Sequence, residues 1–239
     1  MLTNEELTRY ADVLIWGLKT AKKRKFKKYD VVVIRYHQPA RLLAETLYVR
    51  LLKMGLNPVQ RVMDSPSMEK NFYTHGNPRQ LTFVPPGEEN FIRSLNGSIM
   101  LYAPESLTHL GDIDPKKIGK TMVARKYLRD ILDKREDKGS FSWTLCLYPT
   151  SALARHARIS LKSYSRQVAE ACFLNRTEPV EVWQSIHAKI MAIKKRLNRL
   201  PVEKFKVESK NIDLSITPGP KRKWLGLSGR NIPSFEVFI

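Results

Sequence analysis

One carboxylate stands apart among the residues whose types and spacing could do chemistry. Glu236 lies in the apolar run Phe235-Glu-Val-Phe238 near the end of the chain. An ionised carboxylate buried in such a run is costly unless it is paired or binds a cation, which makes Glu236 a candidate metal ligand. The alternative is a glutamate that faces outward from an edge strand. The residue types alone leave both possibilities open.

The other reactive residues form no catalytic constellation. No two histidines have the four-residue spacing that places two metal ligands on one helix face; they are His37, His75, His109, His156 and His187. His37 follows an apolar run, at the carboxyl end of an expected strand, where small ligands bind in parallel sheets. A surface or structural histidine is the alternative there. No serine stands in a G-x-S-x-G elbow. The apolar neighbours of Cys146 and Cys172 predict buried thiols.

Two routes to nucleotide binding are disfavoured. The segment Tyr36-His-Gln-Pro-Ala-Arg41 occupies the position of a dinucleotide fingerprint but contains no glycine, so its backbone cannot approach a pyrophosphate closely. The chain also lacks a G-x-x-x-x-G-K-[ST] phosphate loop.

The charge of the chain is strongly positive. Its 239 residues include 42 Lys plus Arg and 23 Asp plus Glu, which gives +19. Basic residues cluster at 19–28, 116–138 and 189–206, and such clusters can bind phosphate backbones. A basic α/β module that binds nucleic acid or another anionic partner is therefore an alternative function. A solvated basic face is favoured, because two clusters lie on helical patterns with a buried stripe and no RNA-recognition, KH or helix-turn-helix motif is present.

The sequence predicts no membrane partner. No apolar run reaches the roughly 20 residues that a membrane-spanning helix needs. The start, Met1-Leu-Thr-Asn-Glu-Glu-Leu, lacks the basic and apolar regions of a secretory signal. We expect a cytoplasmic protein.

Strand and helix patterns alternate over most of the chain, which predicts an α/β fold with a parallel sheet. Thr3 and Glu6 form a capping-box signature before a helix at 4–23. The apolar run 30–36, a helix at 39–55 and a strand at 57–63 make a βαβ unit. Further strands are expected at 98–102 and 141–148, and further helices at 65–76, 87–95, 114–138, 151–157, 161–175 and 179–200.

The pattern changes after the last of these helices. Residues 205–216 alternate apolar and polar side chains, as a half-exposed antiparallel strand does. We therefore predict two domains: an α/β amino-terminal domain over residues 1–202, and the beginning of a β-rich domain over residues 203–239.

Several segments, in the same order, resemble one enzyme family. Gly229-Arg-Asn-Ile-Pro-Ser-Phe-Glu-Val-Phe238 is similar to the N-[MIL]-P-x-x-E-[VIL]-F signature of the thermophilic metalloaminopeptidases, peptidase family M29. Upstream, Asn211-Ile-Asp-Leu-Ser-Ile216 resembles the strand that enters the family's catalytic domain. Trp143, Tyr148-Pro-Thr150 and Ala154 resemble a third stretch, and Tyr10-Ala-Asp-Val-Leu14 resembles the opening helix. The resemblance thus extends along nearly the whole chain.

The resemblance implies a metal-dependent aminopeptidase, which removes amino-terminal residues from peptide substrates. Family members are homodimers with two divalent metal ions, of the zinc or cobalt type, held by two Glu, two His and one Asp. Glu236 corresponds to the first of these ligands. Phe235 replaces the family's common glycine, and the other ligands, general base and tyrosine have no counterparts here. The expectation is a truncated, amino-terminal portion without catalytic residues of its own, which alone is inactive and binds no metal stably.

Overall fold

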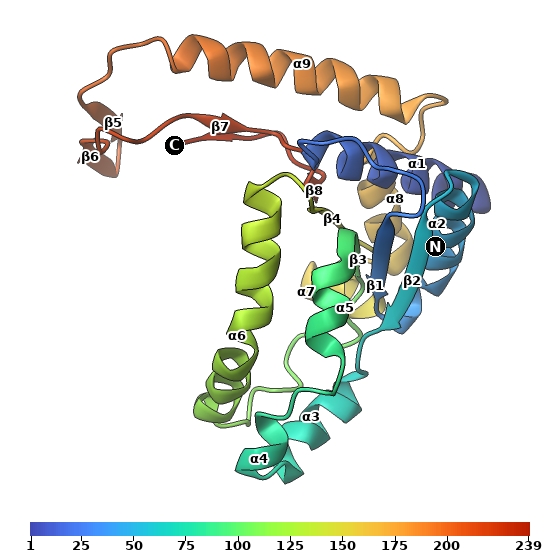
Figure 1. Ribbon diagram of the computed structural model, residues 1–239. Coiled ribbons are helices and arrows are strands. Elements are labelled where there is room, and N and C mark those ends of the chain that lie inside the picture. Colours follow the sequence, from blue (N-terminus) through green and yellow to red (C-terminus); the bar gives the residue numbers. More distant parts are fainter.

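The computed structural model describes residues 1–239 and has a parallel sheet at its centre (Figure 1). Its five strands are β1 (Val31–Tyr36), β2 (Asn57–Val62), β3 (Leu95–Tyr102), β4 (Ser142–Leu147) and β8 (Asn231–Ile232). They lie in the order β2-β1-β3-β4-β8, and every neighbouring pair is parallel. The predicted α/β class is confirmed.

Helices cover both faces of this sheet. One face carries the main core, in which Ile34, Leu101 and Cys146 pack with helices α1 (Asn4–Ala21), α2 (Arg41–Lys53), α8 (Leu161–Ala171) and α9 (Pro179–Leu197). The other face carries a smaller cluster around Val33 and Phe141, covered by α5 (Glu88–Ser94) and α6 (Pro115–Asp137). Because alternate residues of a strand point to opposite faces, both faces of β1 must be apolar, which explains its continuous apolar run.

The short elements complete the body of the molecule. They are the 3₁₀ helix η1 (Gln38–Ala40) and the helices α3 (Pro66–His75), α4 (Pro78–Leu81) and α7 (Ser151–His156). None of the helices is both long enough and apolar enough to span a bilayer.

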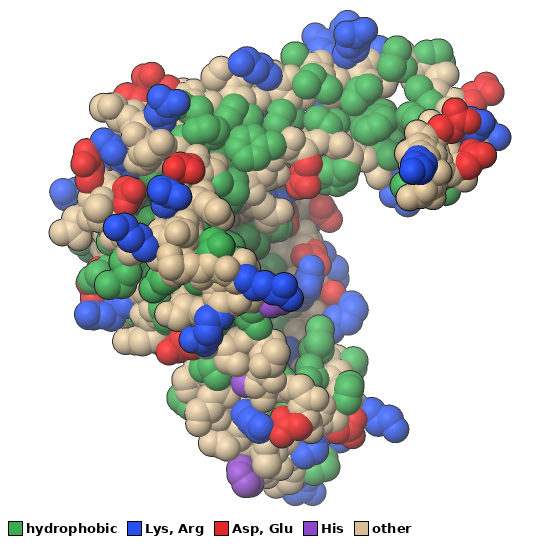
Figure 2. All heavy atoms as spheres, turned by 180° about the vertical axis from the view of Figure 1, so that it is seen from behind, with side chains coloured by type: hydrophobic (Ala, Val, Ile, Leu, Met, Phe, Trp, Pro, Cys, Tyr) green, Lys and Arg blue, Asp and Glu red, His purple; other side chains and the backbone are tan.

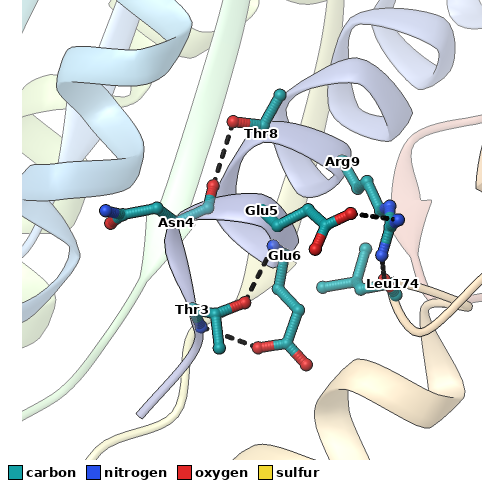
Figure 3. Close-up of polar contacts among 7 residues, drawn as sticks. All are labelled: Thr3, Asn4, Glu5, Glu6, Thr8, Arg9 and Leu174. Atoms are coloured by element: carbon teal, nitrogen blue, oxygen red, sulfur yellow. Dashed lines mark hydrogen bonds and ion pairs between the residues drawn. The ribbon is translucent and has the colours of Figure 1, made fainter. Parts of the chain in front are cut away.

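The capping box at the start of α1 is confirmed (Figure 3). The Thr3 hydroxyl accepts a hydrogen bond from the Glu6 amide at 3.2 Å, and the Glu6 carboxylate accepts one from the Thr3 amide at 2.7 Å. One turn later, Arg9 donates to Glu5 and, at 3.1 Å, to the carbonyl oxygen of Leu174. The first turn of α1 is therefore stabilised by its own capping box and by a contact with the segment after α8.

Two segments differ from the sequence prediction. Strand β3 begins at Leu95 rather than at residue 98. The register with β1 shifts at this point, and the Asn96 side chain accepts a hydrogen bond from the Val31 amide. This bond keeps a polar segment, which would otherwise favour a turn, in the sheet. Residues 205–216 are a hairpin rather than one strand. Its strands β5 (Phe205–Ser209) and β6 (Ile212–Ile216) meet at a turn that contains Asn211, a residue type that favours turns.

Helix α9 and the segments after it form an arm that extends beyond the layered body (Figure 1). The apolar stripe of α9 is buried only in part: Trp183 and Ile190 lie in the core, whereas Ile193 is half exposed. Strands β7 (Leu225–Gly226) and β9 (Val237–Phe238) pair antiparallel along the arm. From the opposite side, the arm overhangs a hollow and carries hydrophobic side chains along its length (Figure 2).

The two predicted domains stay a prediction, and the chain does return to the body after residue 203. Leu227 and Ile232 are buried in the main core, and β8 is the fifth strand of the sheet. The part of the chain that carries Glu236 is therefore anchored on the α/β body.

Candidate functional site

Glu236 lies in an irregular segment directly before β9 and is exposed to solvent. Its side chain has one hydrogen-bond partner, the Ser234 hydroxyl, which donates to Oε1 at 3.2 Å. The carboxylate faces outward rather than into the core. Its charge carries no burial cost and so does not demand a cation.

Strand β8 fixes the start of the segment that leads to Glu236. Leu145 and Cys146 of β4 pair with Asn231 and Ile232. The Thr144 hydroxyl donates to the carbonyl oxygen of Gly229 at 2.8 Å. Gly229 has a φ of +79°, and a methyl group there would lie 2.4 Å from the carbonyl oxygen of Gly17 in α1. The close backbone approach requires glycine at position 229.

Arg230 joins this segment to α6. Its guanidinium forms an ion pair with Glu136, and its Nε lies 2.7 Å from Oε1 of that carboxylate. The second carboxylate oxygen of Glu136 accepts from the Trp143 indole at 3.1 Å. Glu136 therefore links α6, β4 and the segment that follows β7.

Phe235, the residue next to Glu236, packs on a cluster of aromatic side chains. Its ring stacks on Trp183 at a centroid distance of 5.0 Å and meets the edge of Phe173 at 6.1 Å. Trp16 of α1 stacks on Trp183 as well, at 6.0 Å. This contact is not predicted from the sequence, where Phe235 is only a departure from a family pattern. The one signal is an unusual aromatic residue beside a candidate ligand.

The groups that could bind metal do not come together. Nowhere in residues 1–239 do three His, Cys, Asp or Glu side chains form a group that could hold an ion. His109 pairs with Glu69 at 2.8 Å, and His187 lies against the ring of Trp16. His75 and His156 are exposed on α3 and α7. A metal pair needs several ligands, so the donor set present does not fit one. The role of Glu236 as a metal ligand stays a prediction.

His37 lies at the point where the strand order of the sheet reverses. Its Nδ1 accepts from the Ala103 amide at 3.3 Å, between the ends of β1 and β3, and its ring meets the edge of Tyr102 at 5.4 Å. Ligands of open α/β sheets bind in the crevice at this position. One imidazole nitrogen of His37 is used in the hydrogen bond that joins the two strand ends. This contact is a structural role for His37.

The two cysteines are buried thiols, as predicted. The Tyr10 hydroxyl lies 3.5 Å from the Cys172 sulfur and donates to the carbonyl oxygen of Leu147 at 3.1 Å. Burial raises the pKa of Cys172 to about 12, with a smaller opposing effect from Tyr10. Burial also raises the pKa of Cys146 far above its ordinary value. Thiols held protonated in this way are poor nucleophiles.

The fold and the site together define an α/β protein with helices on both sheet faces and with the candidate ligand Glu236 exposed on an appended arm. A family described as thermophilic metalloprotease (M29) matches residues 3–239, and the chain belongs to this family. Divalent metal ions are implied for a metalloprotease family.

Among solved structures, the chain is similar to wild-type AmpT from Thermus thermophilus, with a TM-score of 0.73 and 14% sequence identity. The match covers 98% of this chain and 61% of that chain. At this identity the likeness shows the fold alone. No curated protein matches the sequence.

Proposed function

We propose that the chain provides the α/β part of a metal-dependent aminopeptidase, which removes amino-terminal residues from peptides. The observation that carries the proposal is the match to a metalloprotease family over residues 3–239. The α/β fold shared with AmpT supports it. The position of Glu236 supports it as well, because an exposed carboxylate on an anchored segment is free to bind a metal ion.

The finer features of the proposal follow from the family. The complete site holds two divalent ions of the zinc or cobalt type, with Glu236 as one ligand. Peptides are the substrates, and two copies of the protein form a homodimer in the cytoplasm. A metal pair generates a hydroxide nucleophile and polarises the scissile carbonyl. No step of that reaction is assigned to residues 1–239, because Glu236 belongs to no group of three or more His, Cys, Asp or Glu side chains that could hold a metal ion.

The polypeptide of 239 residues is, in this proposal, inactive by itself. The test incubates it with Zn²⁺ or Co²⁺ and an aminoacyl p-nitroanilide, and titrates both metals by calorimetry. We expect no metal-dependent release of nitroaniline and no stoichiometric metal binding at micromolar concentration, since one carboxylate is a weak site. Metal-dependent release that is lost in Glu236→Gln would overturn the proposed inactivity.

The role of Glu236 is tested in a chimera. Residues 1–239 are joined to the part of T. thermophilus AmpT that the match leaves uncovered, and the monodisperse product is assayed with Co²⁺. We expect aminopeptidase activity that falls by about 10³-fold or more in Glu236→Gln, as for the loss of a group that acts directly in catalysis. Ser234→Ala is the matched control, because it removes only the neighbouring hydroxyl. Full activity in the Glu236→Gln chimera would exclude Glu236 as a ligand.

A further inference from the structure

A second candidate site lies on the opposite edge of the sheet from His37, where β3 and β4 begin. The carboxyl ends of α5 and α6 lie together at this edge (Figure 1). Between them is a pocket of about 450 Å³. Its lining consists of four cations, one apolar residue and one hydroxyl: Arg93, Lys134, Arg135, Lys138, Ile131 and Ser140. No carboxylate lines it.

Some cations at this edge have structural partners. The carboxyl end of a helix attracts cations to its free carbonyl groups. Arg135 donates to the Leu95 carbonyl at 2.7 Å, and Lys22 donates to the carbonyl oxygens of Asn96 and Ser140 at 2.8 Å each. Arg93 pairs with Glu89. These contacts explain why Arg93, Arg135 and Lys22 lie here.

Lys134 and Lys138 also lie at the carboxyl end of α6, but neither has a side-chain or carbonyl partner. The ammonium groups of Lys134 and Lys138 are exposed and form no hydrogen bond or ion pair. The nearby Glu136 carboxylate is occupied by Arg230 and Trp143. Glu89 neutralises Arg93, but no acidic side chain pairs with Lys134 or Lys138, so the pocket keeps an excess of positive charge.

Arg135 is fixed in place at this edge. One nitrogen of its guanidinium binds the Leu95 carbonyl, and its Nε–H is enclosed by the protein without a hydrogen-bond partner. Burial lowers the pKa of the neighbouring Lys22; Asp30 opposes this shift, and Arg135 adds a smaller lowering effect. The cations at this edge therefore repel one another, and an anion in the pocket would offset that repulsion.

We propose that this pocket binds a small polyphosphate-type anion through Lys134, Arg135 and Lys138. The volume admits several phosphate groups, and the lining contains no aromatic side chain on which a nucleic-acid base could stack. The ligand is recognised by its charge and oxygens. The site goes beyond the proposed peptidase function and does not depend on it.

The test measures binding of inorganic linear triphosphate to the full 239-residue chain by calorimetry, in a buffer without phosphate. We expect saturable binding of one triphosphate per chain. In Lys134→Gln/Lys138→Gln, affinity should fall by about tenfold or more, because two unpaired charges beside the ligand are lost. The matched control is Lys189→Gln/Lys195→Gln, which removes the same charge from the exposed face of α9. It should weaken binding by less than about threefold, because distant surface charges are screened.

The geometry is tested separately from the charge. Arg135→Lys keeps the positive charge but removes the planar, forked guanidinium, so it should also weaken triphosphate binding. Unchanged thermal unfolding of the lysine variants is expected, since neither side chain has a partner to lose. Equal weakening in both double variants would overturn the proposal in favour of diffuse attraction to a basic surface. Absence of saturable triphosphate binding would also overturn it. Tight binding of a single-stranded oligonucleotide of about ten nucleotides, without triphosphate binding, would count against the proposal in the same way.

Discussion

Glu136 is the residue through which α6 holds the segment before Glu236. Its carboxylate is largely shielded from solvent and binds both Arg230 and Trp143. Hydrogen bonds between charged groups in such surroundings contribute more than exposed ion pairs do, because water competes less for them. The position of the segment that carries Glu236 therefore depends on the ion pair between Arg230 and Glu136, a residue far away in the sequence.

Replacing Arg230 by glutamine tests this contact. We expect Arg230→Gln to lower the free energy of unfolding by about 1.5–3 kcal/mol, since it leaves a shielded carboxylate with one partner fewer. Arg41→Gln is the matched control: Arg41 pairs with Glu45 on the surface of α2, with both side chains more than half exposed. That change should cost about 0.5 kcal/mol or less. Urea unfolding measures both, and equal losses would show that the Glu136 pair has no special role.

His187 provides a pH-dependent probe of the aromatic cluster between α9 and α1. Burial against Trp16 lowers its pKa below the ordinary value of 6.5, and Lys194 lowers it further. The folded state thus prefers the neutral imidazole. Its contribution to stability is present above pH 6.5 and is lost as the pH falls through the lowered pKa.

The titration of His187 is measurable by NMR, with His187→Gln to assign the signal. We expect a midpoint below 6.5 in the wild-type chain and a higher midpoint in Lys194→Gln, which removes the nearby positive charge. Lys189→Gln, on the same helix, serves as the charge control. A midpoint at or above 6.5 would contradict the burial of this ring against Trp16 of α1.

At the scale of elements, the backbone crossing of Gly17 and Gly229 decides how α1 meets the segment before β8. We expect Gly229→Ala to destabilise the fold by about 2–5 kcal/mol, through left-handed backbone strain plus overlap with the Gly17 carbonyl. Gly87→Ala isolates the first effect, because Gly87 has a φ of +83° but open space around it. It should cost about 1–2 kcal/mol. Thermal or urea unfolding compares the two, and equal losses would mean that the crossing is loose.

The elements that the sequence predicts correctly are those whose signals are local. The capping box of α1, the apolar run of β1 and the Pro115 start of α6 each specify structure within a few residues. Strand β8 has two residues and therefore no periodicity, so its place in the sheet could not be predicted. The same holds for the hairpin, whose turn at Asn211 interrupts an alternation that continues on both sides.

The candidate site shows a similar division. The apolar run around Glu236 and the family resemblance both made it a ligand candidate. Neither predicted that Phe235 stacks on Trp183 while the Glu236 side chain lies in solvent. That contact joins residues far apart in the sequence. The basic pocket also joins α5 and α6 with the start of β4, whereas the sequence shows only charge clusters. Contacts of this kind depend on the tertiary fold and have no local pattern.

At the scale of the whole molecule, a compact body contrasts with an arm that has little of its own core. In the hairpin, Phe205, Val207 and Ser209 pair with Ile216, Leu214 and Ile212 and form one largely apolar face. Val207, Leu214 and Ile212 are about half exposed, at 45%, 47% and 51%. An isolated two-stranded hairpin is marginally stable in water. The hairpin at the end of the arm is therefore expected to open locally at little cost.

Hydrogen exchange measures this contrast directly. We expect the amides of β5 and β6 to exchange almost as fast as unprotected amides, whereas those of β1 and β3 exchange only on global unfolding. Leu214→Ser should change the free energy of unfolding by no more than about 0.5 kcal/mol, because Leu214 packs on nothing in the body. Leu101→Ala, in the main core, should cost about 2–5 kcal/mol. Strong protection of the hairpin at low protein concentration would show instead that the arm folds as a stable unit within a single chain.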